Sequence, residues 1–351
     1  MKTLILGSGA IGSIIAAYLT VEDRDVSIAD PWFQHVEKVR TVGLQVQAVD
    51  RDFDVRLHAL QMDELDQYGT ADVVVISCKS YDTRLMALIA REHLHESTVV
   101  MSAQNGMNDD RIASIVGRSR MVGSVVVMGG HLLDAGTVRR TSPDAAGSLI
   151  LGNLYDTNDY MLEQMEDYFS PLGGLRISTN IWPDRWSKLT LNSMSNTMAG
   201  LSGLKTSTLW SNQMCLDVII ALGHECALVA QAAGIKMAPV FSSIPHELLL
   251  SADKVGNLSW RGVLERMLTV SGTRTGKRSN IPSLLQDVLK GRRTEVHYLN
   301  GFVASEGRRM GVATPMNDML IATFSPIEIG DQEPGLENVL PLGKAVSEQY
   351  G

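Results

Sequence analysis

Residues 2–30 read KTLILGSGAIGSIIAAYLTVEDRDVSIAD and contain the most informative pattern in the chain. A short apolar run ends at Gly7, a G-x-G-x-x-G turn extends to Gly12, and the next apolar residues recur with helical spacing. A second short apolar run ends at Asp30. Strand, glycine-rich turn, helix, strand and acidic residue, in this order, are typical of a βαβ unit that binds a dinucleotide.

The three glycines of the turn have different physical roles. Gly7 permits the tight turn, Gly9 allows a pyrophosphate to approach the backbone, and Gly12 allows the helix to pack closely on the strand. A pyrophosphate placed here accepts hydrogen bonds from N–H groups at the start of the helix. The alternative is a glycine-rich turn that binds no ligand. The predicted cofactor contacts in the turn are Gly7, Ser8, Gly9, Ala10, Ile11 and Gly12.

Asp30 bears on the identity of the cofactor. A carboxylate at the end of the second strand accepts hydrogen bonds from both adenosine ribose hydroxyls and repels a 2′-phosphate. Pro31 follows it, and the next arginine is Arg40. We therefore expect NAD(H). NADP(H) is the alternative, because Arg40, Arg51 or Lys79 could fold back into the pocket.

Strand-like and helical runs alternate up to about residue 180. Two continuous apolar runs of the buried parallel type end in Cys78-Lys79-Ser80 and Gln104-Asn105-Gly106. Ligands of open parallel sheets bind beyond the carboxyl ends of the strands, so we expect Lys79 and Asn105 at that edge. The alternatives are a solvated loop lysine and a simple Asn-Gly turn. Residues 44–50 and 53–60 are expected to form a hairpin or two separate strands.

A polar stripe lies in residues 182–196, which read WPDRWSKLTLNSMSN. Lys188, Asn192 and Asn196 are four residues apart, so on an α-helix they share one face. The rest of this segment is mostly apolar, and polar groups on a buried helix need partners or a ligand. The segment is therefore expected to be one helix with a functional face.

Helical periodicity replaces the strand-like runs from about residue 182 to about residue 324. The expected fold is an α/β N-terminal Rossmann-type dinucleotide-binding domain followed by an all-α C-terminal domain. We place these domains at residues 1–180 and 181–324. Residues 325–351 contain three prolines and several acids, and are expected to form an extended C-terminal tail that can include a short terminal helix.

Two further polar positions stand out in the helical half. Ser283 and Asp287 are one helical turn apart, just after a proline that suits the first turn of a helix. Glu295 is early in the next helical segment, where the helix dipole favours its charge. Glu295 has two possible interpretations. One is purely structural, this dipole effect combined with an ion pair to Arg292 or Arg293, and the other is a functional carboxylate.

Composition excludes several classes of function. The net charge of −8 disfavours a nucleic-acid-binding surface. Cys78, Cys215 and Cys226 have no paired spacing, so neither a disulfide framework nor a metal site is expected. No run of eighteen or more apolar residues indicates a membrane span, and the glycine-rich N-terminus does not resemble a signal peptide. We expect a cytoplasmic protein without a membrane or nucleic-acid partner.

Several motifs in one order resemble those of the ketopantoate reductase (2-dehydropantoate 2-reductase) family, over about residues 1–320. They are GSGAIG at 7–12, CKS at 78–80, QNGM at 104–107, WSKLTLNSMSN at 186–196, SLLQD at 283–287 and RRTEVHYLNG at 292–301. The resemblance implies a two-domain NAD(P)H-dependent reductase, expected to be a homodimer, that binds a small-molecule substrate in the cleft between its domains. It delivers a hydride to the keto carbon of a 2-oxo acid, as in pantothenate biosynthesis.

The resemblance also implies roles for individual residues. Lys188 would be the general acid, and Glu295 would hold the substrate beside it as the second catalytic residue. Lys79 would contact the cofactor, and Asn105 would lie near the nicotinamide. The implied substrate-binding residues are Asn192, Asn196, Asn280 and Ser283.

Two departures from the family pattern motivate a second hypothesis. Asp30-Pro31 stands where pantoate-forming members have a basic residue suited to NADP, and residues 236–280 are longer than in compact members. The alternative function is an NAD-dependent alcohol dehydrogenase of the same family, acting on a bulkier hydroxy substrate in catabolism. A third hypothesis, a regulator that binds nicotinamide but lost its chemistry, is disfavoured because both Lys188 and Glu295 are present.

Overall fold

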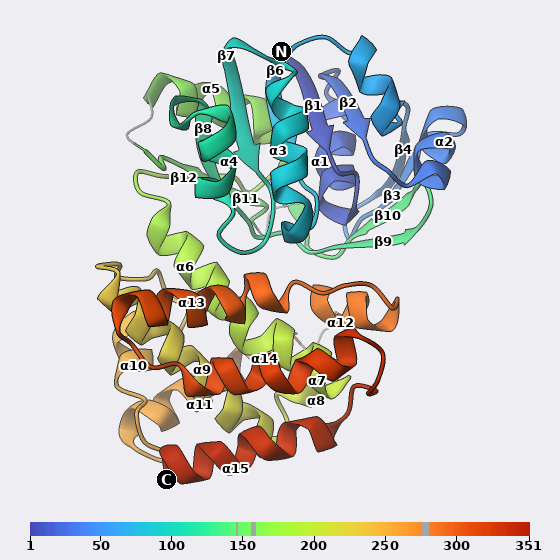
Figure 1. Cartoon of the computed structure of the whole chain (residues 1–351). Coiled ribbons are helices and arrows are strands. Elements are labelled where there is room, and N and C mark those ends of the chain that lie inside the picture. The colour runs from blue at the N-terminus through green and yellow to red at the C-terminus, as the bar shows by residue number, and fades with distance from the viewer. Residues whose placement is uncertain (145–146, 156–158, 275–280) are drawn as a thin grey trace. The chain divides into compact units, whose positions relative to one another are not determined.

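The computed structural model describes residues 1–144, 147–155, 159–274 and 281–351. The chain forms two compact units, Met1–Ile181 and Trp182–Gly351, which are described separately (Figure 1). The first is an α/β unit built on a mostly parallel sheet, and the second is helical. The expected combination of an α/β N-terminal part and a helical C-terminal part is confirmed.

The large sheet of the first unit has the strand order β12-β11-β8-β7-β6-β1-β2-β5. Neighbouring strands are parallel except β8 and β11. Its central strands are short apolar runs because helices cover a parallel sheet on both faces. The strands are β1 (Lys2–Leu6), β2 (Asp25–Ala29), β5 (His58–Leu60), β6 (Ala71–Ile76), β7 (Leu94–Ser102), β8 (Met121–Val126), β11 (Leu149–Gly152) and β12 (Arg176–Ser178).

A smaller sheet packs against the first helix, α1 (Ala10–Val21). Its order is β4-β3-β10-β9, with β3 (Leu44–Gln47), β4 (Asp52–Val55), β9 (Gly130–Asp134) and β10 (Thr137–Arg140). Residues 44–60 thus supply a hairpin to this sheet and β5 to the large one. Figure 1 shows α3 and α4 side by side on the large sheet. The remaining helices are α2 (Phe33–Thr41), α3 (Thr83–Arg91), α4 (Asp109–Val116), α5 (Asp159–Phe169) and the short 3-10 turns η1 (Met62–Gln67), η2 (Ser80–Asp82), η3 (Arg118–Arg120) and η5 (Ser170–Leu172).

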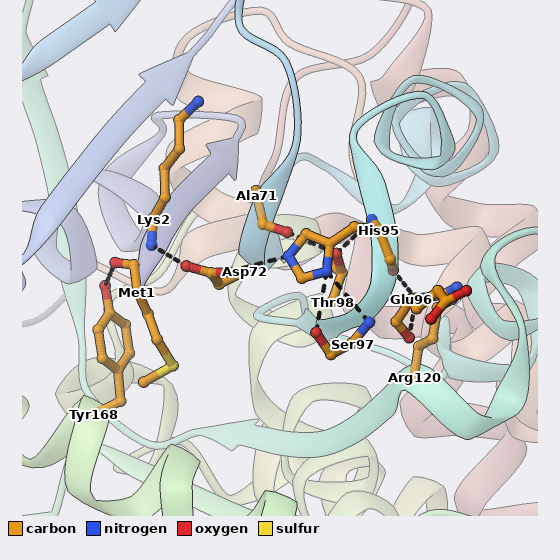
Figure 2. Close-up of polar contacts among 10 residues, drawn as sticks. All are labelled: Met1, Lys2, Ala71, Asp72, His95, Glu96, Ser97, Thr98, Arg120 and Tyr168. Carbon is orange, nitrogen blue, oxygen red and sulfur yellow. Dashed lines mark hydrogen bonds and ion pairs between the residues drawn. The ribbon is translucent and has the colours of Figure 1, made fainter.

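A polar cluster joins the starts of β1, β6 and β7 (Figure 2). The Asp72 carboxylate accepts the Lys2 backbone N–H at 2.6 Å and lies 3.0 Å from His95 Nε2. His95 Nδ1 lies 3.1 Å from the Ser97 hydroxyl. The Lys2 N–H, followed by His95, holds the pKa of Asp72 below its usual value. The cluster therefore ties three neighbouring strands together at their N-terminal ends.

Replacing Asp72 with alanine is expected to lower the stability of the first unit by about 1 kcal/mol at pH 7, because two hydrogen bonds are lost. Since the folded-state pKa of Asp72 is depressed, its contribution is present above the usual value of 3.8 and is lost as pH falls through the folded-state pKa. Thermal unfolding of both proteins at pH 7 and pH 3 measures this difference. An equal difference at both pH values would contradict the assignment.

The second unit is organised around α9 (Gln213–Ala232), whose residues are mostly buried. By length and composition α9 is apolar enough to cross a membrane, but 78% of its most apolar stretch is buried within the structure, as in core helices. The other elements are α6 (Trp182–Leu191), the π-helical turn η6 (Asn192–Asn196), α7 (Thr197–Ser202), α8 (Thr206–Leu209), α10 (His246–Leu250), α11 (Leu258–Arg274), α12 (Ser283–Leu289), η7 (Val296–Tyr298), α13 (Asn300–Met310), α14 (Pro315–Glu328), η8 (Leu336–Val339) and α15 (Leu340–Gln349).

The tail at 325–351 is not extended as expected, although the short terminal helix that was also expected forms as α15. Residues 325–328 complete α14, and α15 packs on α9 with Leu342 and Val346 buried. The Tyr350 ring lies 5.9 Å from those of His224 and Trp260. The prolines were misleading because Pro341 occupies the first turn of α15, where a missing N–H costs nothing.

Candidate functional site

The glycine-rich turn joins β1 to α1, and packing explains two of its glycines. Gly7 has a φ of +96°, and a Cβ on it would lie 2.7 Å from the backbone nitrogen of Cys78. A Cβ on Gly12 would lie 2.1 Å from the Gly7 carbonyl oxygen. A Cβ on Gly9 would meet no atom of the described residues within 4 Å. Packing therefore does not require Gly9, and the open space at its Cβ position fits the approach of a ligand to the backbone.

The start of α1 suits an anion. The helix has no side-chain N-cap and no acidic residue in its first turn, so its first N–H groups are available to an anionic ligand. The Ser8 hydroxyl is buried beside them and has no hydrogen-bond partner among the described residues. Such an orphaned buried donor indicates an unfilled partner position. These observations fit the pyrophosphate of a dinucleotide bound by Gly7 to Gly12.

Asp30 ends β2 and accepts two backbone hydrogen bonds. The Ser8 N–H donates to one carboxylate oxygen at 2.7 Å, and the Trp32 N–H donates to the other at 2.8 Å. The carboxylate is thereby fixed against the glycine-rich turn. Each oxygen keeps a second acceptor position, which suits a ribose hydroxyl.

His35 supports the same turn and was missed by sequence reasoning. Its Nδ1 accepts the Gly136 N–H at 3.0 Å, and its Nε2 lies 3.5 Å from the Ser13 hydroxyl. The Ser13 hydroxyl donates to the Ser8 carbonyl at 2.7 Å. Burial lowers the pKa of His35, which keeps the ring neutral and able to accept from Gly136. No motif in the sequence signals this contact, because its partners are 22 and 101 residues away.

Hydrogen bonds connect the loops that carry Lys79 and Asn105, at the carboxyl ends of β6 and β7. The Gln104 amide donates to the Cys78 carbonyl and the Thr83 hydroxyl, both at 2.9 Å. The Asn108 amide donates to the Ser80 hydroxyl at 3.1 Å and to the Asn105 carbonyl at 2.8 Å. Gln104, Ser80 and Asn108 thus hold the two predicted residues on adjacent strands. Asn105-Gly106 does form a turn, but hydrogen bonds also connect this turn to the loop that follows β6.

In the helical unit, the expected single α-helix over 182–196 is wrong in its last turn. Thr197 N–H donates to the Asn192 carbonyl, five residues earlier, so Asn192–Asn196 form a π-turn. This leaves the Ser193 carbonyl without its α-helical N–H. The Thr197 hydroxyl at 2.7 Å and the Asn300 amide at 3.1 Å donate to it instead. Side-chain donors that compete for a carbonyl produce such bulges, which occur frequently at functional sites.

Three of the predicted substrate-binding residues come together at this turn. The Asn196 amide donates to the Asn192 side-chain oxygen at 3.0 Å and to the Ser283 hydroxyl at 3.2 Å. Lys188 lies one turn earlier, in the last turn of α6. Glu295 is buried and immediately precedes η7, rather than lying within a helix. Asn280 lies outside the described residues.

Asn300, Asn317 and Glu225 connect to the π-turn and were also missed. The sequence shows Asn300 within RRTEVHYLNG and Glu225 as one of two acids in an otherwise apolar run, but neither pattern predicts a partner. Among the residues that the structure describes, no group of three or more His, Cys, Asp and Glu side chains is placed to hold a metal ion. The polar groups placed at the π-turn are the Asn192 and Asn196 amides and the Ser283 hydroxyl, and Lys188 lies one helical turn earlier.

Two family models match the chain. The model "Ketopantoate reductase PanE/ApbA" matches residues 3–154, and "Ketopantoate reductase PanE/ApbA C terminal" matches residues 180–328. A curated 2-dehydropantoate 2-reductase of Pyrococcus abyssi is 28% identical over 324 residues, which are 91% of this chain and 95% of that protein.

Solved structures show the same architecture. A PanE/ApbA family ketopantoate reductase from Ralstonia eutropha is 25% identical with a TM-score of 0.76, over 95% of this chain and all of that one. A D-mandelate dehydrogenase solved with NADH and anilino(oxo)acetate is 21% identical with a TM-score of 0.78, over 99% of both chains. At this identity the second likeness concerns the fold alone.

Proposed function

Because this chain belongs to the ketopantoate reductase family, we propose that it reduces ketopantoate or a close relative to the 2-hydroxy acid. Membership makes the protein an oxidoreductase of CH–OH groups that uses a nicotinamide cofactor. The observation that carries the proposal is the π-turn, where Asn192, Asn196 and Ser283 converge one helical turn beyond Lys188. Neutral donors beside an ammonium suit a substrate with both a carboxylate and a carbonyl.

Each residue has a proposed step in the reaction. A reduced nicotinamide cofactor, held by the glycine-rich turn, would supply the hydride that the keto carbon accepts. The keto oxygen gains negative charge, and the Lys188 ammonium donates a proton to it, becoming an amine that regains a proton from solvent. Asn192, Asn196 and Ser283 are proposed to orient the substrate through hydrogen bonds that add no charge. Glu295 is proposed to hold the substrate beside Lys188.

For the cofactor we propose NAD(H), bound by the glycine-rich turn, with Lys79 and Asn105 beside it. Asp30 is held by the Ser8 and Trp32 N–H groups, and its carboxylate is proposed to accept from the adenosine ribose and to repel a 2′-phosphate. Arg40, a candidate for binding that phosphate, instead donates to the Ala59 carbonyl at 2.9 Å and pairs with Glu37 and Glu64. These contacts support NAD(H) over NADP(H).

The second candidate is oxidation of a bulkier hydroxy acid with NAD⁺, which Asp30 also favours. Within the longer segment 236–280, residues 246–250 form α10 and residues 258–274 form α11, and both helices pack on α9. Trp260 on α11 donates to Asp217 at 3.0 Å. The homodimer and the cytoplasmic location remain proposals, which gel filtration and cell fractionation would test.

The deciding assay gives the purified protein ketopantoate with NADH and, separately, with NADPH. We expect turnover with NADH, and a kcat/KM for NADH at least about tenfold above that for NADPH, since one lost ribose contact costs about 1.4 kcal/mol. An aryl 2-hydroxy acid with NAD⁺ tests the second candidate. No turnover of ketopantoate with either cofactor would remove the first candidate, and a preference for NADPH would contradict the role of Asp30.

A further inference from the structure

Three buried polar side chains form a continuous relay that ends at the π-turn. Glu225 lies in the middle of α9, Asn317 in the first turn of α14, and Asn300 at the start of α13. The three side chains are at most 5% exposed. All three side chains take part in hydrogen bonds, while the Asn300 Oδ1 has no partner among the described residues. A connected set of buried hydrogen bonds specifies one arrangement of the elements that carry it.

The relay begins at the Glu225 carboxylate, which caps the start of α14 from another helix. One oxygen accepts the Met316 N–H at 2.7 Å, and the other accepts the backbone N–H of Asn317 at 2.9 Å and its side-chain amide at 2.7 Å. Thr314, at the N-cap of α14, makes no side-chain cap. Burial raises the pKa of Glu225 to about 7, although these three donors favour its charged form.

The carboxylate sets the direction of the amides that follow. It presents only acceptors when ionised, so Asn317 must turn its amide nitrogen toward it and its oxygen toward Asn300. The Asn300 amide nitrogen therefore donates one hydrogen bond to that oxygen at 2.9 Å and another to the Ser193 carbonyl at 3.1 Å. A flipped Asn300 would bring its oxygen against two acceptors. The relay thus supplies a donor to the Ser193 carbonyl, which does not receive the Thr197 N–H.

We propose that Glu225, Asn317 and Asn300 are positioning residues, which hold the π-turn at Asn192–Asn196 so that Asn192 and Asn196 face the substrate together. The inference rests on the proposed function for its substrate but not for its geometry. An α-helical turn in place of the π-turn would return the Ser193 carbonyl to Thr197 N–H and rotate Asn192 relative to Asn196. The donated hydrogen bond from Asn300 opposes this change.

The test is the isosteric change Asn300→Asp, which removes both donations and places oxygen against two acceptors. The matched control is Asn338→Asp. Asn338 is also a buried asparagine of this unit, and its amide donates to the carbonyls of Leu201 and Glu333. For N300D we expect KM for ketopantoate to rise at least about tenfold, the cost of one poorly made hydrogen bond. The Kd for NADH should stay within about twofold of wild type. N338D should lose stability without the change in KM.

A second measurement does not depend on turnover. Hydrogen exchange of peptides covering residues 192–198 should be faster in N300D than in N338D, because the π-turn loses its external donor. If N300D does not fold, Asn300→Ala removes the same donations without added charge and has the same expected results. Equal KM values, or equal exchange, for the Asn300 and Asn338 variants would overturn the proposal. Absence of turnover in the wild-type protein would instead contradict the proposed function, and the exchange result would still decide the relay.

Discussion

Replacing Lys188 with alanine is expected to lower kcat for 2-oxo acid reduction by about 10²–10⁴-fold, the usual contribution of a positioned general acid. The keto oxygen acquires negative charge as the hydride is transferred. Without the Lys188 ammonium, this oxygen has neither its proton donor nor the positive charge that stabilises it. Lys188 lies in the last turn of α6, one turn before the π-turn that groups Asn192 and Asn196. Single-turnover measurement of NADH oxidation with saturating substrate isolates this step from product release.

Two controls separate the proton from the charge. Lys188→Arg keeps a positive hydrogen-bond donor, but a guanidinium does not give up its proton, so kcat should stay low. Lys344→Ala removes an exposed lysine on α15 and should leave kcat unchanged. If hydride transfer in K188A matched wild type, Lys188 would not be the acid. Recovery of full activity in K188R would show that charge alone suffices.

The glycine-rich turn gives the second large effect, through two alanine substitutions with different outcomes. A Cβ at Gly12 meets the Gly7 carbonyl oxygen, a backbone atom that cannot move aside. Gly12→Ala should therefore destabilise the first unit by about 3 kcal/mol. Gly9 has an ordinary extended backbone and open space around its Cβ position. Gly9→Ala should cost at most about 1 kcal/mol, because alanine is a poorer N-cap.

For cofactor binding we expect the opposite order: Gly9→Ala, which costs less stability, should weaken NADH binding more than Gly12→Ala. In folded Gly9→Ala protein the added methyl group stands where a pyrophosphate approaches the backbone, so the Kd for NADH should rise at least about tenfold. Thermal unfolding and fluorescence titration with NADH measure the two quantities on the same sample. A Gly9→Ala protein that binds NADH as tightly as wild type would place the pyrophosphate elsewhere.

The sequence by itself determined the features whose physical causes are local. The glycines at 7 and 12 are needed by a turn of six residues, and strand, helix and strand follow within thirty residues, so pattern alone predicted the βαβ unit. The same holds for the strand ends at Lys79 and Asn105, where continuous apolar runs mark buried parallel strands. In the helical half, periodicity predicted helices, and the spacing of Lys188, Asn192 and Asn196 predicted a polar face.

The tertiary structure decided what depends on partners distant in the chain. Asn300, 107 residues from Ser193, takes part in converting the last turn of the predicted helix into a π-turn, and Glu225 orients that contact through Asn317, 92 residues away. The tail folded because α9 offers it an apolar surface, although its prolines suggested otherwise. Local propensities are weak compared with the cost of an unsatisfied buried carbonyl or an exposed apolar face. The arrangement of the polar face was therefore set by side chains that no local pattern connects to it.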